Sequence, residues 1–317
     1  MRVLEGRIDV HAHIVPPFLT EAAREAGYGA SISAGFPRWT EELALDFMDE
    51  NGIAATFNSV SQPGVHYGDD VKARRLARQC NEFLAEVATR HPERFGSFAA
   101  VPLPDVDGAL AEIAYALDVL KLDAVGLLAS YGASFLGDAK FDPVLSLLNE
   151  RAATVFIHPN YHPSSKSLGM GIPGFLVEFP FDTTRAVANL IFTGALERFP
   201  RIKFILAHNG GNIPFLSWRL AMAPLIDPRF KQLSPESVLA AVRSFYYETA
   251  QAAGPGPMAA MSAVADPTHL LFGTDWPYCP ASVTQAGDVA LLEELGSEAA
   301  AADIFRNNAL RLFPRFG

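Results

Sequence analysis

The stretch Arg7-Ile8-Asp9-Val10-His11-Ala12-His13 predicts a short buried strand with two histidines at its carboxyl end. Similar short apolar runs recur along the chain, and longer segments with helical periodicity separate them. Eight strands in this alternation favour an α/β fold of the (β/α)8 TIM barrel type over a doubly wound open sheet. The predicted strands are Arg7–His13, Ile53–Ser61, Phe95–Val101, Ala124–Ser130, Thr154–His158, Lys203–His208, Phe245–Thr249 and His269–Asp275.

Helical patterns fill the segments between these strands. The clearest are Thr40–Glu50, Asp70–Arg90, Val106–Leu120, Phe141–Arg151 and Phe181–Phe199, with further helices predicted in Ala286–Phe313. Two segments, Ile14–Pro37 and Asn160–Gly174, exceed the usual length of a βα loop. In a barrel both would leave the carboxyl ends of strands, so we expect them to form walls or a lid over the site.

The composition limits the kind of protein. The 317 residues are 50% hydrophobic and 19% charged, with a formal net charge of -10 at pH 7. We expect one domain over residues 1–317 and neither nucleic acid nor an anionic membrane as a partner. Two cysteines, Cys80 and Cys279, are too few for a disulfide framework. Because Met1–Gly6 leads directly into the first strand and no run of about 18 apolar residues occurs, we expect no signal peptide, no membrane span and a cytoplasmic location.

Residues that can bind a metal lie at the carboxyl ends of the predicted strands. His11 and His13 are two apart on the first strand, which directs both imidazoles to one face. His158 ends the fifth strand and Asp275 ends the eighth. Since strand ends converge on one face of a barrel, these residues predict one divalent ion bound by three nitrogens and one oxygen. Zn²⁺ suits this set, with Mn²⁺ and Fe²⁺ as alternatives, and a position stays open for water or substrate.

Each of these residues also has a structural interpretation. A single histidine at a strand end is more often hydrogen-bonded in the core, although several strand ends must then be explained separately. Asp9 precedes His11 by two and is a candidate ligand, partner of a ligand or core carboxylate. In His208-Asn209-Gly210-Gly211 the glycines allow close approach of the backbone to a ligand. We expect His208 to transfer a proton or polarise the substrate, with orientation of Asp275 as the alternative.

Four motifs together resemble the amidohydrolase superfamily. They are Asp9-x-His11-x-His13, Ile157-His158-Pro159, Ala207-His208-x-Gly210-Gly211 and Gly273-Thr274-Asp275-Trp276-Pro277. The closer similarity is to its decarboxylase branch, the relatives of aminocarboxymuconate-semialdehyde and γ-resorcylate decarboxylases. This similarity extends to Asn81-Glu82-Phe83 and Asn307-Asn308-Ala309. Within the branch, Ser130-Tyr131-Gly132 and Phe135-Leu136-Gly137 resemble 6-methylsalicylate decarboxylases.

The resemblance implies a set of metal ligands and a catalytic group. The implied ligands are His11, His13, His158 and Asp275. His208 matches the catalytic histidine of the family. Binuclear members of the superfamily carry a metal-bridging lysine at the end of the fourth strand. The stretch Ala124–Ser130 has no lysine, so we expect a single metal ion.

The resemblance also implies three substrate contacts. Arg219 matches an arginine that the family sends across a homodimer interface to hold a substrate carboxylate, which implies a homodimer. Phe175 falls where relatives place an aromatic residue against the substrate ring. Arg38 corresponds to a substrate-binding arginine, although a solvated loop arginine is an equal interpretation at this position.

The implied reaction is the non-oxidative loss of CO2 from a small aromatic or unsaturated carboxylic acid, of the ortho-hydroxybenzoate type and similar to 6-methylsalicylate. Two routes stay open: Asp275 protonates the ring with the help of His208, or a hydroxide that His208 activates adds to the substrate first. The nearest alternative function is a metal-dependent hydrolase or hydratase of a lactone, amide or oxo-acid, which would share every ligand. A non-catalytic barrel with a structural metal and a metal-free barrel are the remaining alternatives.

Overall fold

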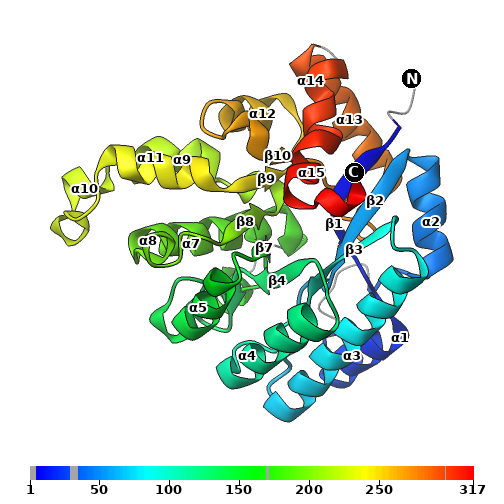
Figure 1. Ribbon diagram of the computed structural model, residues 1–317. Coiled ribbons are helices and arrows are strands. Elements are labelled where there is room, and N and C mark those ends of the chain that lie inside the picture. The colour runs from blue at the N-terminus through cyan, green and yellow to red at the C-terminus, as the bar shows by residue number, and fades with distance from the viewer. Residues whose placement is uncertain (1–4, 29–34, 169–170, 297) are drawn as a thin grey trace.

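Eight parallel strands form a barrel in the computed structural model, which describes residues 5–28, 35–168, 171–296 and 298–317 (Figure 1). They pair in the order β1-β2-β3-β4-β7-β8-β9-β10, and each pair of neighbours is parallel. The strands are β1 (Arg7–His13), β2 (Ile53–Ser59), β3 (Phe95–Ala99), β4 (Ala124–Leu128), β7 (Thr154–His158), β8 (Lys203–Leu206), β9 (Tyr246–Glu248) and β10 (Leu270–Leu271). The predicted (β/α)8 fold is thus confirmed.

The sheet closes where β1 meets the segment after β10. The N–H of Val10 donates to the carbonyl of Phe272 at 2.9 Å, and the N–H of His13 donates to the carbonyl of Trp276 at 2.8 Å. Isolated parallel bridges join the same two segments, which excludes the open sheet. The predicted strand His269–Asp275 has only two residues of regular strand, because its second half pairs with β1 through these single bridges.

Asp9 fastens this seam. Its Oδ1 accepts the N–H groups of His11 at 2.9 Å and Thr274 at 3.0 Å. Its Oδ2 accepts the hydroxyls of Thr274 at 2.7 Å and Thr56 at 3.2 Å. Asp9 and Ala12 are three residues apart but pair with residues of β2 that are two apart, so β1 carries one extra residue that interrupts the alternation of its side chains. Asp9 therefore binds neighbouring strands as a core carboxylate, and burial raises its pKa to about 6 despite these hydrogen bonds.

Aromatic rings fill the interior of the barrel. Phe57, Phe98 and Phe156 are fully buried, and the rings of Phe98 and Phe156 stack with their centroids 5.1 Å apart. Two phenylalanines near the C-terminus, Phe313 and Phe316, place their rings 4.0 Å and 5.0 Å from that of Phe57. The interior is therefore a packed core, and the polar side chains of the site are confined to the strand ends.

Helices surround the strands, as Figure 1 shows. The predicted helix Phe181–Phe199 consists of two helices, α7 and α8, because Gly194 adopts a φ of 71° between them. The predicted strand Ala124–Ser130 ends at Leu128, and a hairpin of β5 (Ser130–Tyr131) and β6 (Ser134–Phe135) follows. The helices are α1 (Pro17–Glu25), α2 (Glu41–Glu50), α3 (Asp70–Arg90), α4 (Val106–Ala114), α5 (Asp142–Glu150), α6 (Ser165–Leu168), α7 (Glu178–Phe192), α8 (Ala195–Arg198), α9 (Ile213–Ala221), α10 (Ala223–Ile226), α11 (Pro235–Ser244), α12 (Pro255–Ser262), α13 (Ala281–Leu295), α14 (Glu298–Ala302) and α15 (Asn308–Leu312).

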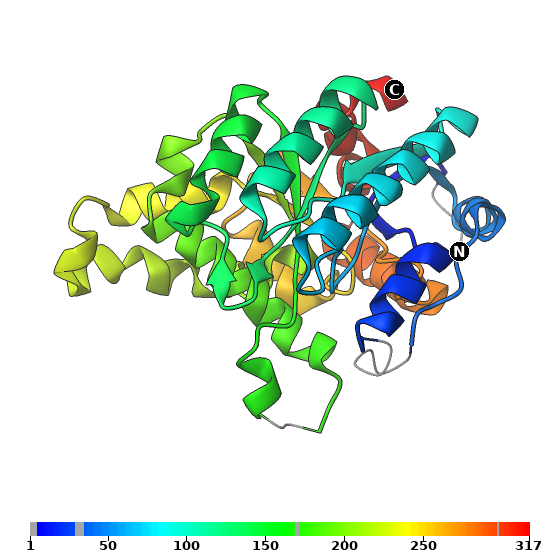
Figure 2. The same cartoon turned by 90° about the horizontal axis from the view of Figure 1, so that it is seen from below.

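The two long segments project from the same end of the molecule (Figure 2). Residues 14–37 contain α1, and residues 160–174 contain α6 and reach the 3-10 turn η3 (Gly174–Leu176). Parts of both segments, 29–34 and 169–170, lie outside the described residues, as do residues 1–4, on which the expectation of no signal peptide rests. None of the helices in the described ranges is long and apolar enough to cross a membrane. The single-domain organisation and the cytoplasmic location stay predictions.

Replacement of Asp9 tests the seam. Asp9→Ala leaves its buried N–H and O–H donors without an acceptor, so we expect the free energy of unfolding to fall by about 2–5 kcal/mol. Urea unfolding followed by circular dichroism measures this loss. Asp46→Ala, at an exposed position on α2, is the control and should change stability by less than about 0.5 kcal/mol. Equal stabilities of the two variants would contradict the role of Asp9.

Candidate metal centre

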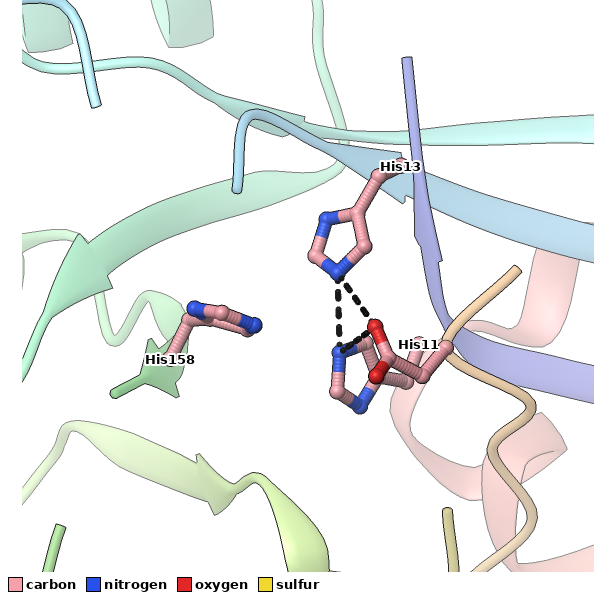
Figure 3. A group of neighbouring side chains, drawn as sticks. His11, His13 and His158 are labelled. Atoms are coloured by element: carbon pink, nitrogen blue, oxygen red, sulfur yellow. Dashed lines mark hydrogen bonds and ion pairs between the residues drawn. The ribbon is translucent and has the colours of Figure 1, made fainter. Parts of the chain in front are cut away.

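Four buried side chains meet at the carboxyl end of the barrel. The ligand atoms of His11, His13, His158 and Asp275 all lie within 4.8 Å of one another. Nε2 of His13 lies 3.0 Å from Nε2 of His11 and 3.0 Å from Oδ1 of Asp275. Figure 3 shows the three imidazoles grouped around one small space. The structure thus brings together the residues that were predicted as ligands, although His13 and Asp275 are 262 residues apart.

A hydrogen bond at the far nitrogen sets the orientation of each ring. The Nδ1 contacts are His11 with Oε1 of Glu248 at 2.8 Å, His13 with Oγ of Ser59 at 2.9 Å and His158 with the carbonyl of Pro159 at 2.8 Å. Carboxylate and carbonyl oxygens only accept, so His11 and His158 donate from Nδ1 and present Nε2 to the group. Proteins commonly orient metal-binding imidazoles in this way.

The charges at the site favour a cation. Nε2 of His11, Nε2 of His13 and Oδ1 of Asp275 converge, and lone pairs at such short range repel one another unless positive charge lies between them. Burial lowers the pKa of His11, but Glu248 and Asp275 outweigh it and raise this pKa to about 10, so without a metal ion His11 carries a proton at Nε2 that a bound cation would replace. Burial also lowers the pKa of His13 and holds the pKa of His158 well below its usual value, so both imidazoles are neutral. Imidazole nitrogens with one carboxylate oxygen are a donor set that fits Zn²⁺ or Mn²⁺.

Both carboxylate oxygens of Asp275 have hydrogen-bond partners. Burial alone would raise its pKa, but His11 and the neighbouring imidazole hold it well below the usual range. Gln251 donates from Nε2 to Oδ2 at 2.6 Å, which leaves Oδ1 facing the histidines. Asp275 and Gln251 have left-handed φ angles of 62° and 56°, which residues other than glycine adopt mostly where the surroundings demand it. Gly273 has to be glycine, since a Cβ there would collide with Oε2 of Glu248.

Glu248 is a positioning residue. Its Oε1 accepts from Nδ1 of His11 at 2.8 Å and from the N–H of His208 at 2.5 Å, and its Oε2 accepts from the N–H of Ala250 at 2.6 Å. The ligand atoms of His11, His208 and Glu248 also lie within 4.8 Å of one another. Because these hydrogen bonds occupy both carboxylate oxygens, Glu248 is better suited to orient His11 than to bind an ion.

His208 lies beside the four ligands. Its half-buried ring has its centroid 5.0 Å from that of His11. Its Nδ1 donates to the carbonyl of Ala250 at 3.0 Å, so Nε2 can take up or release a proton. Gln251, rather than His208, makes the hydrogen bond that orients Asp275. The geometry therefore favours the proton-transfer interpretation of His208 over the orienting one.

The glycines that follow His208 serve packing. Gly210 and Gly211 have φ angles of 69° and 63°. A Cβ on Gly211 would collide with the carbonyl of Pro180 on α7, and one on Gly210 would press against the ring of Tyr247 in β9. The two glycines thus bring this turn against α7 and β9, and their approach to a ligand stays a prediction.

A cavity of about 950 Å³ opens beside the ligand group. His158 lines it directly, and so does Ser59, which contacts His13. Residues of both long segments, including Tyr28 and Ile172, form part of its wall, which confirms their predicted place over the site. A cavity of this size with polar groups converging at one end is typical of small-molecule sites.

Three predicted substrate contacts lie apart from this cavity. Phe175, in η3, is 42% exposed, and Arg38 and Arg219 are also exposed. None of the three is among the described residues that line the cavity. Within one copy of the chain they therefore do not line the cavity, and their contacts with substrate stay predictions.

Sequence analysis missed Glu248, Gln251 and Ser59. Glu248 ends β9, so an acidic residue at the carboxyl end of a predicted barrel strand was a signal that could have identified it. Gln251 lies in the loop that follows, and Ser59 is a small polar residue at the end of β2. Neither has a sequence pattern that separates it from ordinary loop or strand residues.

Comparisons with known proteins identify similar sequences and similar folds. Residues 8–315 match the family of amidohydrolases. The 6-methylsalicylic acid decarboxylase of Penicillium expansum is 38% identical over 316 residues, which cover 98% of this chain and 97% of that protein. The crystal structure of a protein described as amidohydrolase II superposes with a TM-score of 0.90 at 28% identity, over 98% of this chain and 100% of the other. A dihydroxybenzoic acid decarboxylase of Polaromonas sp., solved with manganese and 2-nitroresorcinol, has the same fold at a TM-score of 0.81 and 24% identity, over 98% and 97% of the two chains.

Glu248→Gln tests the positioning of His11. The amide keeps the shape of the side chain but removes its charge and one acceptor oxygen, so we expect Zn²⁺ affinity to fall about 10- to 100-fold. Competition with a chromophoric chelator measures it. His208→Asn is the control, because asparagine tolerates the φ of 53° there and the N–H that Glu248 accepts is retained. The control should stay within about threefold of the unmodified protein, whereas an unchanged affinity in Glu248→Gln would contradict its role.

Proposed function

Because the chain belongs to the amidohydrolase family, we propose that it is a metal-dependent decarboxylase that releases CO2, without oxidation, from a small aromatic carboxylic acid. The substrate class is an ortho-hydroxybenzoate similar to 6-methylsalicylate. One observation carries the proposal: four buried ligand atoms converge within 4.8 Å at the edge of a cavity of about 950 Å³. The likeness to a 6-methylsalicylic acid decarboxylase over nearly the whole of both chains supports the reaction class.

The proposed metal ligands are His11, His13, His158 and Asp275. A single divalent ion, when bound there, supplies Lewis acidity that stabilises negative charge on the carboxylate and neighbouring hydroxyl oxygens of the substrate. Zn²⁺ is the first choice, since imidazole and carboxylate ligands in a small set suit it. Mn²⁺, which the Polaromonas decarboxylase holds, is the alternative.

The chain's own side chains supply the proton and exclude water. Loss of CO2 breaks the bond between the ring carbon and the carboxylate, and a proton replaces the carboxylate at that carbon. His208, with Nε2 free, and Asp275, with Oδ1 directed at the ligand group, are the candidates for its delivery. Gln251 keeps Asp275 in place, and the buried ring of Phe156 lines the cavity beside His158. Exclusion of water strengthens the electrostatic interactions on which this step depends.

We also propose a homodimer formed through α9 and α10, which Figure 1 shows extending away from the barrel together with α11. These two helices carry Phe215, Trp218, Leu225 and Ile226 with exposures of 81%, 67%, 71% and 77%. Large apolar side chains exposed together are typical of an interface between proteins. Arg219 lies among them and makes no hydrogen bond or ion pair with the described residues, which leaves it available to a second copy.

Decarboxylation in D2O tests the function. We expect the metal-loaded protein to consume one acid from a panel that includes 6-methylsalicylate and 2,6-dihydroxybenzoate, with deuterium appearing at the carbon that carried the carboxylate, as followed by proton NMR. His208→Asn should bind the metal but lose turnover by at least about 100-fold. An unchanged panel combined with hydrolysis of a lactone, amide or oxo-acid would replace the decarboxylase with a hydrolase. Full turnover by His208→Asn would remove this residue from the mechanism.

Sedimentation tests the homodimer. An aspartate buried in the interface in place of Trp218 would weaken the association by several kcal/mol, on the order of the effect of an interface hot spot. We therefore expect Trp218→Asp to sediment as a monomer and the unmodified protein to sediment as a dimer. Val71→Asp, at a position on α3 that is 69% exposed, makes a comparable surface change elsewhere and should stay dimeric. A monomeric unmodified protein would contradict the proposed interface.

A further inference from the structure

The wall of the cavity carries a buried carboxylate. Of the lining residues that the structure describes, Glu178 is the only one with a carboxylate, and none is an arginine. Apart from His158, two lining side chains can carry a positive charge, Lys140 and His66, and both contact other residues. Nζ of the exposed Lys140 lies 4.8 Å from the ring centroid of Phe141, and Nε2 of His66 lies 2.7 Å from the carboxylate of Asp70. Within one copy of the chain, the described part of the wall therefore offers Glu178 no ionic partner.

The surroundings of Glu178 stabilise its negative charge. It is the first residue of α7, where the helix dipole favours an anion. Its Oε2 accepts the hydroxyl of Ser165 at 2.7 Å, and the whole residue is only 8% exposed. The next residue, Phe179, has its ring 5.9 Å from that of His158, so the start of α7 lies close to the ligand group.

Stability alone does not explain this carboxylate. A buried charge without an ionic partner costs more than an apolar side chain of similar size would. An acidic residue in the first turn of a helix already interacts favourably with the helix dipole when it is exposed to water, without the cost of burying a charge. The place of Glu178 on the cavity wall is therefore better explained by what enters the cavity.

We propose that Glu178 is a specificity-determining residue that restricts the enzyme to monocarboxylic acids. This inference rests on the proposed use of the cavity for an aromatic acid. With one substrate carboxylate at the ligand group, a second carboxylate on the ring would enter the cavity that Glu178 lines, and the two negative charges would repel each other in poorly hydrated surroundings. Methyl, hydroxyl and ester substituents carry no charge and meet no such repulsion.

Two ligands of nearly equal size test this inference. They are 5-carboxysalicylate, a dicarboxylate, and its 5-methyl ester, a monocarboxylate. Isothermal titration calorimetry measures the Kd of each for the Zn²⁺-loaded protein. We expect the ester to bind at least about tenfold more tightly than the dicarboxylate, and this ratio to fall below about threefold in Glu178→Gln. Glu197→Gln, an equal change of charge at an exposed position on α8, should leave the ratio unchanged.

Glu178→Met, measured in parallel, removes the charge in a side chain of similar length, so the result does not depend on the folding of one variant. A ratio near one in the unmodified protein, absence of binding by both ligands, or an unchanged ratio in either folded Glu178 variant would overturn the inference. The first and third of these outcomes are distinct from failure of the proposed function, whereas absence of binding by both ligands would also remove the aromatic-acid site on which the inference rests. A protein that binds the ester selectively but never releases CO2 would refute the decarboxylase and leave the charge selection of the cavity established.

Discussion

The seam that closes the barrel is the constraint on which the rest of the structure depends. Asp9 holds it by accepting hydrogen bonds from β1, from β2 and from Thr274 in the last strand segment. In an open sheet the first and last strands would be opposite edges, and His13 and Asp275 could not approach to 3.0 Å. The extra residue in β1 interrupts the side-chain alternation, so that one strand supplies both the carboxylate of the seam and the two histidines of the site.

The charges at the ligand group differ from those on the cavity wall. Buried carboxylates of Asp275 and Glu248 contact His13 and His11 and favour a cation. Within one copy of the chain, the described part of the cavity wall carries the carboxylate of Glu178 and no arginine. In the proposed function this asymmetry orients the substrate, because its charged end is attracted to the ligand group and its neutral ring substituents occupy the cavity. Specificity and metal binding would then depend on the same distribution of buried charge.

Local sequence patterns predicted the bounds of a strand well where the whole pattern lay within that strand. β1 and β7 have the predicted bounds, since each is a short apolar run that ends at a histidine. The residues that orient the ligands were not predictable in this way. His11 and Glu248, for example, are 237 residues apart, and only the closed barrel brings them to 2.8 Å. The same holds for Gln251, whose importance follows entirely from its contact with Asp275.

The sequence by itself determined the alternation of strands and helices, the candidate metal ligands and the resemblance to decarboxylases, because each depends on residue type and on spacing along the chain. Only the tertiary structure decided that Asp9 belongs to the seam, that Gly211 packs against α7, and that Glu178 is a buried carboxyl group in the cavity wall. The physical reason is that burial and hydrogen bonding depend on which distant segments surround a side chain. Periodicity along one element carries no information about those neighbours.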